Sequence, residues 1–123
     1  MMCRFDHYNF NVHDQRKSIE FYAQALGLKP VREKTAPDGS YHLVFLGDGV
    51  TGFTLELTAV TGRTEPYDLG EGEYHLAFRT DDIEALRARH REMGCILREK
   101  TDSPVYFIKD PDGYCLEILP EKY

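Results

Sequence analysis

The chain has 123 residues, of which 41% are hydrophobic, and this predicts one soluble globular domain or two small modules that share a core. Its net charge of −6, with Lys and Arg interspersed among acidic residues, excludes a nucleic-acid partner and favours a small-molecule ligand. No stretch approaches the roughly 20 apolar residues of a membrane span and no signal peptide is recognisable, so we expect a cytoplasmic protein without a membrane partner. The three cysteines have unrelated spacings, which predicts free thiols.

The first half of the chain predicts a strand, a helix and three further strands. In chain order they occupy residues 5–12, 14–27, 29–34, 41–46 and 54–58. The helix is indicated by Ile19, Tyr22 and Leu26, which recur at three- and four-residue spacing. Asp14 is its start signal and Gly27 its C-terminal stop. The strand at 29–34 is the least defined of these elements.

The second half predicts a similar order of elements, without a separate strand between the helix and the hairpin. A strand, a helix and a hairpin occupy residues 73–80, 81–94, 105–109 and 114–119. Asp81 and Glu84 have the spacing of a capping box, so we expect Asp81 to begin the helix, and Gly94 closes it. The DPDG stretch at 110–113 predicts the turn of the hairpin.

These two halves form a faint internal repeat. Each begins with a strand histidine and ends with a strand glutamate. Between these residues, Leu26-Gly27 is followed by REK at 32–34, and Met93-Gly94 is followed by REK at 98–100. The repeat predicts an α+β fold in one domain of residues 1–123, built from two βαβββ modules of about residues 1–64 and 73–123.

Alternation along the strands places the repeated polar residues on one face. His7, Asn9 and Asn11 oppose the apolar side of their strand, and His75 and Arg79 share the corresponding face in the second half. A single strand His is more often a hydrogen-bonded sheet residue, and a single strand Glu is more often solvated. Duplicated His and Glu residues favour a divalent metal site instead, since His and Glu are usual ligands and desolvated carboxylates without a cation are costly.

At these residues the chain resembles the glyoxalase I (lactoylglutathione lyase) group of the vicinal-oxygen-chelate superfamily. The resemblance rests on SIEFYAQALGLK at 18–29, YDLGEGEYHLAF at 67–78 and DPDGYCLEIL at 110–119. It implies two modules with curved mixed sheets that form a metal-binding cleft. The metal ligands that it implies are His7, Glu56, His75 and Glu117.

The resemblance also implies a reaction. Its substrate is the hemithioacetal of methylglyoxal and a thiol, classically glutathione, and its product is the S-lactoyl thioester. The metal polarises the two adjacent substrate oxygens and stabilises an enediolate while a glutamate moves a proton between neighbouring carbons. Glu117 is the expected base and Glu56 its pseudo-symmetric partner, and the sequence does not decide which of them acts.

Four protein ligands would close a tetrahedral zinc site, so an octahedral site completed by two waters or two substrate oxygens is expected. This favours Ni²⁺ or Co²⁺, with Zn²⁺ as a possible occupant. The family usually forms its site between two subunits. We therefore expect a homodimer with two sites, in which His7 and Glu56 of one chain meet His75 and Glu117 of the other.

Several residues depart from the family pattern. Asn11 stands where family members place an arginine that binds the glutathione carboxylate. We expect Asn11 and Arg79 to contact substrate, with Arg79 supplying the anion contact; pairing of Arg79 with a nearby acid is the alternative. Glu56 argues against extradiol dioxygenases and methylmalonyl-CoA epimerases. Thiol transferases of the fosfomycin-resistance type and metal-free small-molecule binding proteins of this fold remain alternative functions.

Overall fold

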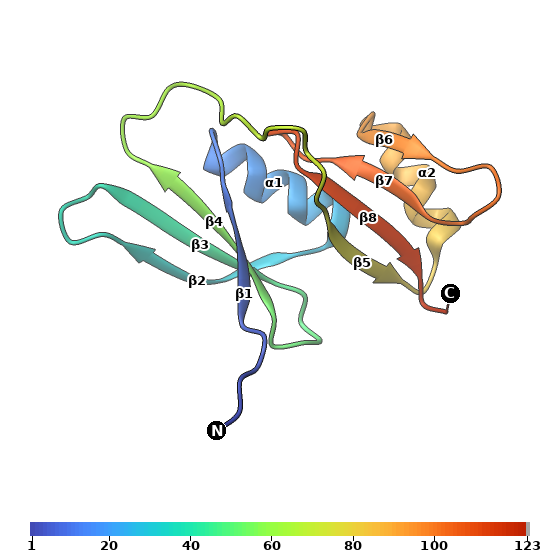
Figure 1. Cartoon of the computed structure of the whole chain (residues 1–123), viewed down its shortest axis with the longest axis horizontal. Helices are drawn as coiled ribbons and strands as arrows, with labels where there is room; N and C mark the ends of the chain where they lie inside the picture. The colour runs from blue at the N-terminus through green and yellow to red at the C-terminus, as the bar shows by residue number, and fades with distance from the viewer. Residues whose placement is uncertain (123) are drawn as a thin grey trace. The chain divides into compact units, whose positions relative to one another are not determined.

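The computed structural model describes residues 1–122 and divides the chain into two compact units, each with one sheet and one helix (Figure 1). The first unit is Met1–Tyr67, and the second begins at Asp68. Each unit has the order strand, helix and three strands. The predicted α+β fold of two βαβββ modules is therefore confirmed.

The first unit forms a four-stranded mixed sheet in the order β1-β4-β3-β2. Its elements are β1 (His7–Asn11), α1 (Gln15–Leu26), β2 (Lys29–Thr35), β3 (Tyr41–Gly47) and β4 (Thr54–Val60). β1 runs parallel to β4, whereas β2 and β4 pair antiparallel to β3. Side chains of α1 and the sheet bury an apolar core that includes Phe10, Tyr22, Leu55 and Leu57.

The second unit repeats this topology in the order β5-β8-β7-β6. Its elements are β5 (Leu76–Thr80), α2 (Ile83–Met93), β6 (Ile96–Glu99), β7 (Tyr106–Lys109) and β8 (Cys115–Pro120). β5 is parallel to β8, and the other two pairs are antiparallel. Its core combines Ile108, Leu116 and Ile118 with the buried polar residues Arg87 and His90.

The helix ends agree with the sequence signals at three of four positions. Asp14 caps α1 by accepting a hydrogen bond from the Lys17 amide at 3.1 Å, and Gly27 ends the helix in the left-handed conformation. Gly94 ends α2 in the same way. The predicted start of α2 at Asp81 is wrong: α2 begins at Ile83, so Asp82 precedes it directly and accepts from the Ala85 amide at 3.1 Å.

Two further expectations concern the cysteines and the surface. Cys3, Cys95 and Cys115 are free thiols, as predicted.

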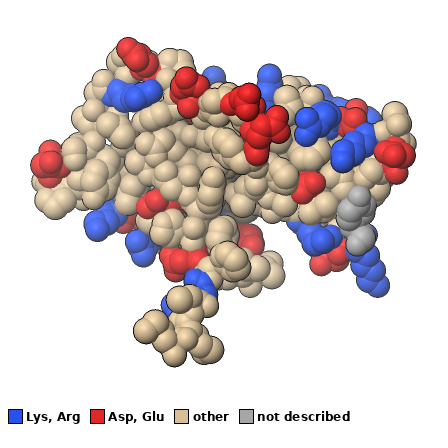
Figure 2. Space-filling model, viewed as in Figure 1, with Lys and Arg blue, Asp and Glu red and all other residues tan. Residues whose placement is uncertain are grey.

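Within residues 1–122, no helix is both long enough and apolar enough to cross a membrane. On the face shown in Figure 2, acidic and basic side chains are interspersed.

Candidate metal centre

The first His–Glu pair, His7 and Glu56, lies on neighbouring strands of the first unit. β1 and β4 are parallel, and their register places Thr54 beside His7 and Glu56 beside Asn9. Because alternate residues share a face, His7 and Glu56 project from the same side of the sheet. His7 Nε2 lies 3.7 Å from Glu56 Oε1, with 39% of the histidine and 14% of the glutamate side chain exposed.

The second His–Glu pair, His75 and Glu117, has the same arrangement in the second unit. His75 directly precedes β5, and Glu117 lies on β8 beside Ala77. His75 Nε2 is 3.3 Å from Glu117 Oε1, with exposed side-chain fractions of 45% and 20%. In each pair, an imidazole Nε2 and a carboxylate oxygen therefore lie close together on a partly exposed face of that unit's sheet.

The spacing of the two donor atoms tests whether each pair fits a metal ion. Metal–ligand bonds of about 2.1 Å at angles of about 90–110° separate two neighbouring donor atoms by about 3.0–3.4 Å. The separation in the second pair lies in this range, and that in the first pair is slightly longer. Within residues 1–122, no group of three or more His, Cys, Asp or Glu side chains gathers to hold a metal ion, and each pair offers two ligands.

Asp6 supports the first His–Glu pair and was not identified from the sequence. Its Oδ2 lies 2.7 Å from His7 Nδ1, and this hydrogen bond is the main reason that the pKa of Asp6 is lowered. A carboxylate that accepts from Nδ1–H fixes the tautomer in which Nε2 carries the free lone pair needed for metal binding. In the second unit Tyr74 precedes the histidine, so this carboxylate has no counterpart.

A phenylalanine and an arginine extend the first His–Glu pair across the sheet. Phe45 on β3 pairs with Glu56, and its ring meets the His7 ring edge-on at 5.6 Å and 87°. Arg32 on β2 pairs with Phe45, and its guanidinium carbon lies 4.3 Å from the ring centroid. The register shifts between Pro30 and Arg32. This bulge brings Arg32 opposite Phe45.

The second unit repeats the arrangement. Phe107 pairs with Glu117 and meets the His75 ring at 5.7 Å and 78°. Arg98 pairs with Phe107, lies 4.4 Å from its ring centroid and follows a register shift that begins at Ile96. Arg32 and Arg98 are the first residues of the two REK stretches. The REK repeat in the sequence therefore marks this arrangement in both units.

Asn11 and Arg79, the expected substrate contacts, both have hydrogen bonds in the structure. Asn11 accepts from the Asn9 amide at 2.7 Å and donates to the Tyr67 hydroxyl at 3.5 Å. Arg79 donates to the carbonyl oxygen of Pro120 at 2.8 Å. Each residue lies in the same unit as one His–Glu pair.

Comparison with known proteins places these features in a family. The family model of the Glyoxalase/Bleomycin resistance protein/Dioxygenase superfamily matches residues 4–118. A lactoylglutathione lyase of Neisseria meningitidis is 36% identical over 127 residues, which are 97% of this chain and 91% of the relative. The chain belongs to the glyoxalase I family of this superfamily. The family is metal-dependent, which agrees with the donor atoms of both pairs.

Other glyoxalase I proteins extend the comparison. The solved structure of the trypanothione-dependent glyoxalase I of Leishmania major has a TM-score of 0.88 and 36% identity, and covers 98% of this chain and 88% of that one. The lactoylglutathione lyase of Arabidopsis thaliana is 36% identical over 94% of this chain. The chain spans 44% of that plant relative, which is less than half of its length.

Proposed function

We propose that the protein is a metal-dependent lactoylglutathione lyase. It would convert the hemithioacetal of methylglyoxal and a thiol to the S-lactoyl thioester by enediolate proton transfer. The observation that carries this proposal is the duplicated His–Glu pair, in which a histidine Nε2 and a carboxylate oxygen face one another at 3.7 and 3.3 Å. Membership of the glyoxalase I family supports the reaction class.

The residues divide the chemistry among them. A divalent metal ion held by His7, Glu56, His75 and Glu117 would supply a Lewis acid for the two adjacent substrate oxygens and so acidify the neighbouring C–H bond. Glu117 acts as the general base that takes this proton and returns it to the adjacent carbon. Glu56 is its counterpart in the repeat. The partial exposure of all four side chains leaves them accessible to a small substrate.

Ni²⁺ or Co²⁺ is our proposed metal, with Zn²⁺ as a further occupant. His7, Glu56, His75 and Glu117 would hold the ion through imidazole nitrogens and carboxylate oxygens, donor types that suit these ions. The test measures hemithioacetal isomerase activity of chelator-stripped protein with methylglyoxal and glutathione, before and after addition of each ion. Activity should return with Ni²⁺ or Co²⁺. Stoichiometric metal binding without any activity would overturn the proposed reaction.

We propose further that the active protein is a cytoplasmic homodimer. Each site would combine His7 and Glu56 of one subunit with His75 and Glu117 of the other. A complementation experiment tests this arrangement. His7→Ala and His75→Ala variants should each be inactive, and mixing them under exchange conditions should restore part of the activity. A mixed dimer has one site with all four ligands if the site is shared. Sites formed within single chains would leave the mixture as inactive as its components.

A further inference from the structure

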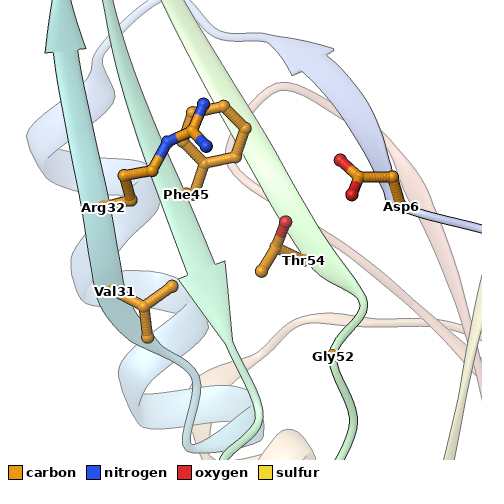
Figure 3. Close-up of a pocket in the computed structure, with 6 residues that line it drawn as sticks. All are labelled: Asp6, Val31, Arg32, Phe45, Gly52 and Thr54. Atoms are coloured by element: carbon orange, nitrogen blue, oxygen red, sulfur yellow. The ribbon is translucent and has the colours of Figure 1, made fainter.

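A small pocket lies in the first unit (Figure 3). It has a volume of about 260 Å³, and its lining residues are Asp6, Val31, Arg32, Phe45, Gly52 and Thr54. Two of them contact His7: Asp6 through the hydrogen bond to Nδ1, and Phe45 through its ring edge. Sites for drug-sized ligands begin at about 300 Å³, so this pocket fits one end group of a ligand whose remainder extends outward.

Opposite charges face one another across this pocket. Figure 3 shows the Asp6 carboxylate on one side, the Arg32 guanidinium on the other and the Thr54 hydroxyl between them. Asp6 and Arg32 form no ion pair with each other. A gap between the charges is thus a feature of the pocket.

Both charged groups keep unused hydrogen-bonding capacity. The guanidinium of Arg32 covers Phe45, which is only 5% exposed, and among residues 1–122 this guanidinium has no hydrogen bond or ion pair. A guanidinium that rests on a ring by its face keeps its in-plane N–H donors for an anion. Asp6 uses Oδ2 for His7, and within the described chain its Oδ1 has no hydrogen-bond partner.

We propose that this pocket binds the α-amino-acid group of the thiol, with its carboxylate on Arg32 and its ammonium on Asp6. A zwitterionic group matches both charges at once, whereas a simple anion would lie opposite the Asp6 carboxylate. The γ-glutamyl end of glutathione carries such a group. This inference rests on the proposed function, because the thiol is part of the hemithioacetal. It also assigns the pocket a ligand in the unit where Asn11 replaces the family arginine.

The second unit provides an internal contrast. Arg98 covers Phe107 as Arg32 covers Phe45, but Tyr74 stands where Asp6 would be. The second unit therefore offers an arginine without a carboxylate at the position that corresponds to Asp6. Recognition of an ammonium group should depend on the first unit alone.

Calorimetric binding of S-hexylglutathione to the Ni²⁺-loaded protein tests the inference without requiring turnover. Arg32→Gln should weaken binding about tenfold, and Asp6→Asn should weaken it several-fold. An asparagine keeps an oxygen acceptor for His7 Nδ1–H, so bound Ni²⁺, measured in parallel, should remain stoichiometric. Arg16→Gln, on an exposed face of α1, removes the same charge outside the pocket and should leave affinity unchanged.

Modified ligands identify which charged group of the ligand each residue binds. N-acetylation of the γ-glutamyl amine should abolish the effect of Asp6→Asn, and amidation of its α-carboxylate should abolish that of Arg32→Gln, as in a double-mutant cycle. Any change in affinity caused by Arg98→Gln should be the same for the free ligand and for the N-acetylated ligand. The inference is overturned if wild-type protein does not bind S-hexylglutathione, or if either pocket variant behaves like Arg16→Gln. It is also overturned if Asp6→Asn weakens both ligands equally.

Failure of the proposed function would look different. The protein could bind S-hexylglutathione with the expected dependence on Asp6 and Arg32 and yet show no isomerase activity with any metal ion. That result would support the pocket assignment and contradict the lyase reaction.

Discussion

The two units carry the same set of side chains on one face of the sheet and differ in their interiors. In both, a His–Glu pair, a phenylalanine edge and a stacked arginine lie across the sheet, and the corresponding ring distances differ by only about a tenth of an ångström. The helix faces that pack behind these sheets differ. α1 buries Ser18, Tyr22 and Ala25, whereas α2 buries Arg87 and His90. Repeated chemistry therefore constrains the face of a sheet more strongly than its core.

The polar interior of the second unit is a connected network. His90 Nδ1 lies 2.8 Å from the Tyr106 hydroxyl, and the Arg87 guanidinium lies 4.5 Å from the Tyr106 ring centroid. Arg87 also donates to Glu99 at 3.0 Å and to the Pro104 carbonyl at 2.7 Å. Buried polar groups are stable when paired in this way, and removal of one member breaks hydrogen bonds of the others.

Separate replacement of the two glutamates should give the largest difference in activity between the two units. Glu117→Gln is expected to lower kcat by about 10²–10⁴-fold, because it removes the proposed general base. Glu56→Gln should lower kcat less at saturating metal. Steady-state kinetics with metal content measured on the same samples compares the two. A larger loss in Glu56→Gln would move the base to the first unit.

The Asp6 carboxylate, which is hydrogen-bonded to His7, should make the two His–Glu pairs unequal in metal binding. Asp6→Ala is expected to weaken Ni²⁺ affinity by about 10–100-fold, since it removes the acceptor that orients His7. Tyr74→Phe is the matched change in the second unit and should have little effect. Competition with a chelator gives both affinities. Equal affinities in the Asp6→Ala variant and the wild type would contradict the orienting role of Asp6.

The buried network of the second unit should appear in stability at high pH. Burial raises the pKa of Tyr106, so the folded state keeps its proton where the unfolded tyrosine, with a pKa of about 10, loses it. Stability should therefore fall as pH rises above about 10, by up to about 1.4 kcal/mol per pH unit from this residue.

Urea unfolding of Tyr106→Phe tests that expectation. The variant should lose about 1–3 kcal/mol near neutral pH, because the hydrogen bond between His90 and the Tyr106 hydroxyl is lost, and its alkaline decline should be shallower than that of the wild type. Tyr8→Phe, at a site that is 44% exposed, is the control and should keep the wild-type slope. An unchanged slope in Tyr106→Phe would show that other groups cause the decline.

The smallest expected effect concerns Glu99 at the edge of the same network. Its hydrogen bond with Arg87, and then that with Arg91, lowers the pKa of Glu99, so its contribution to stability is present at neutral pH and is lost as pH falls below about 4.5. Glu99→Gln should flatten the stability profile in acid. Denaturant midpoints measured from pH 3 to 7 compare it with the wild type. A parallel acid decline in both proteins would exclude Glu99 as its source.

Strand alternation and the repeat predicted the four candidate ligands because these residues follow the period of two that every sheet imposes. They did not predict Asp6, which precedes β1, so its position relative to His7 is not set by alternation. Nor did they predict the role of Arg32 and Arg98, because a bulge shifts the register before each of them. The capping-box spacing of Asp81 and Glu84 predicted the wrong start of α2, because the side chain of the next residue, Asp82, accepts from the helix amide of Ala85.

The same bulges have a consequence for the outer edges of the two sheets. β2 and β6 are edge strands, whose free backbone groups are a template on which a strand of another molecule can add. An irregular register interrupts that template, and the neighbouring charged side chains oppose close approach. The residues that aim the two arginines thereby also protect these edges from aggregation.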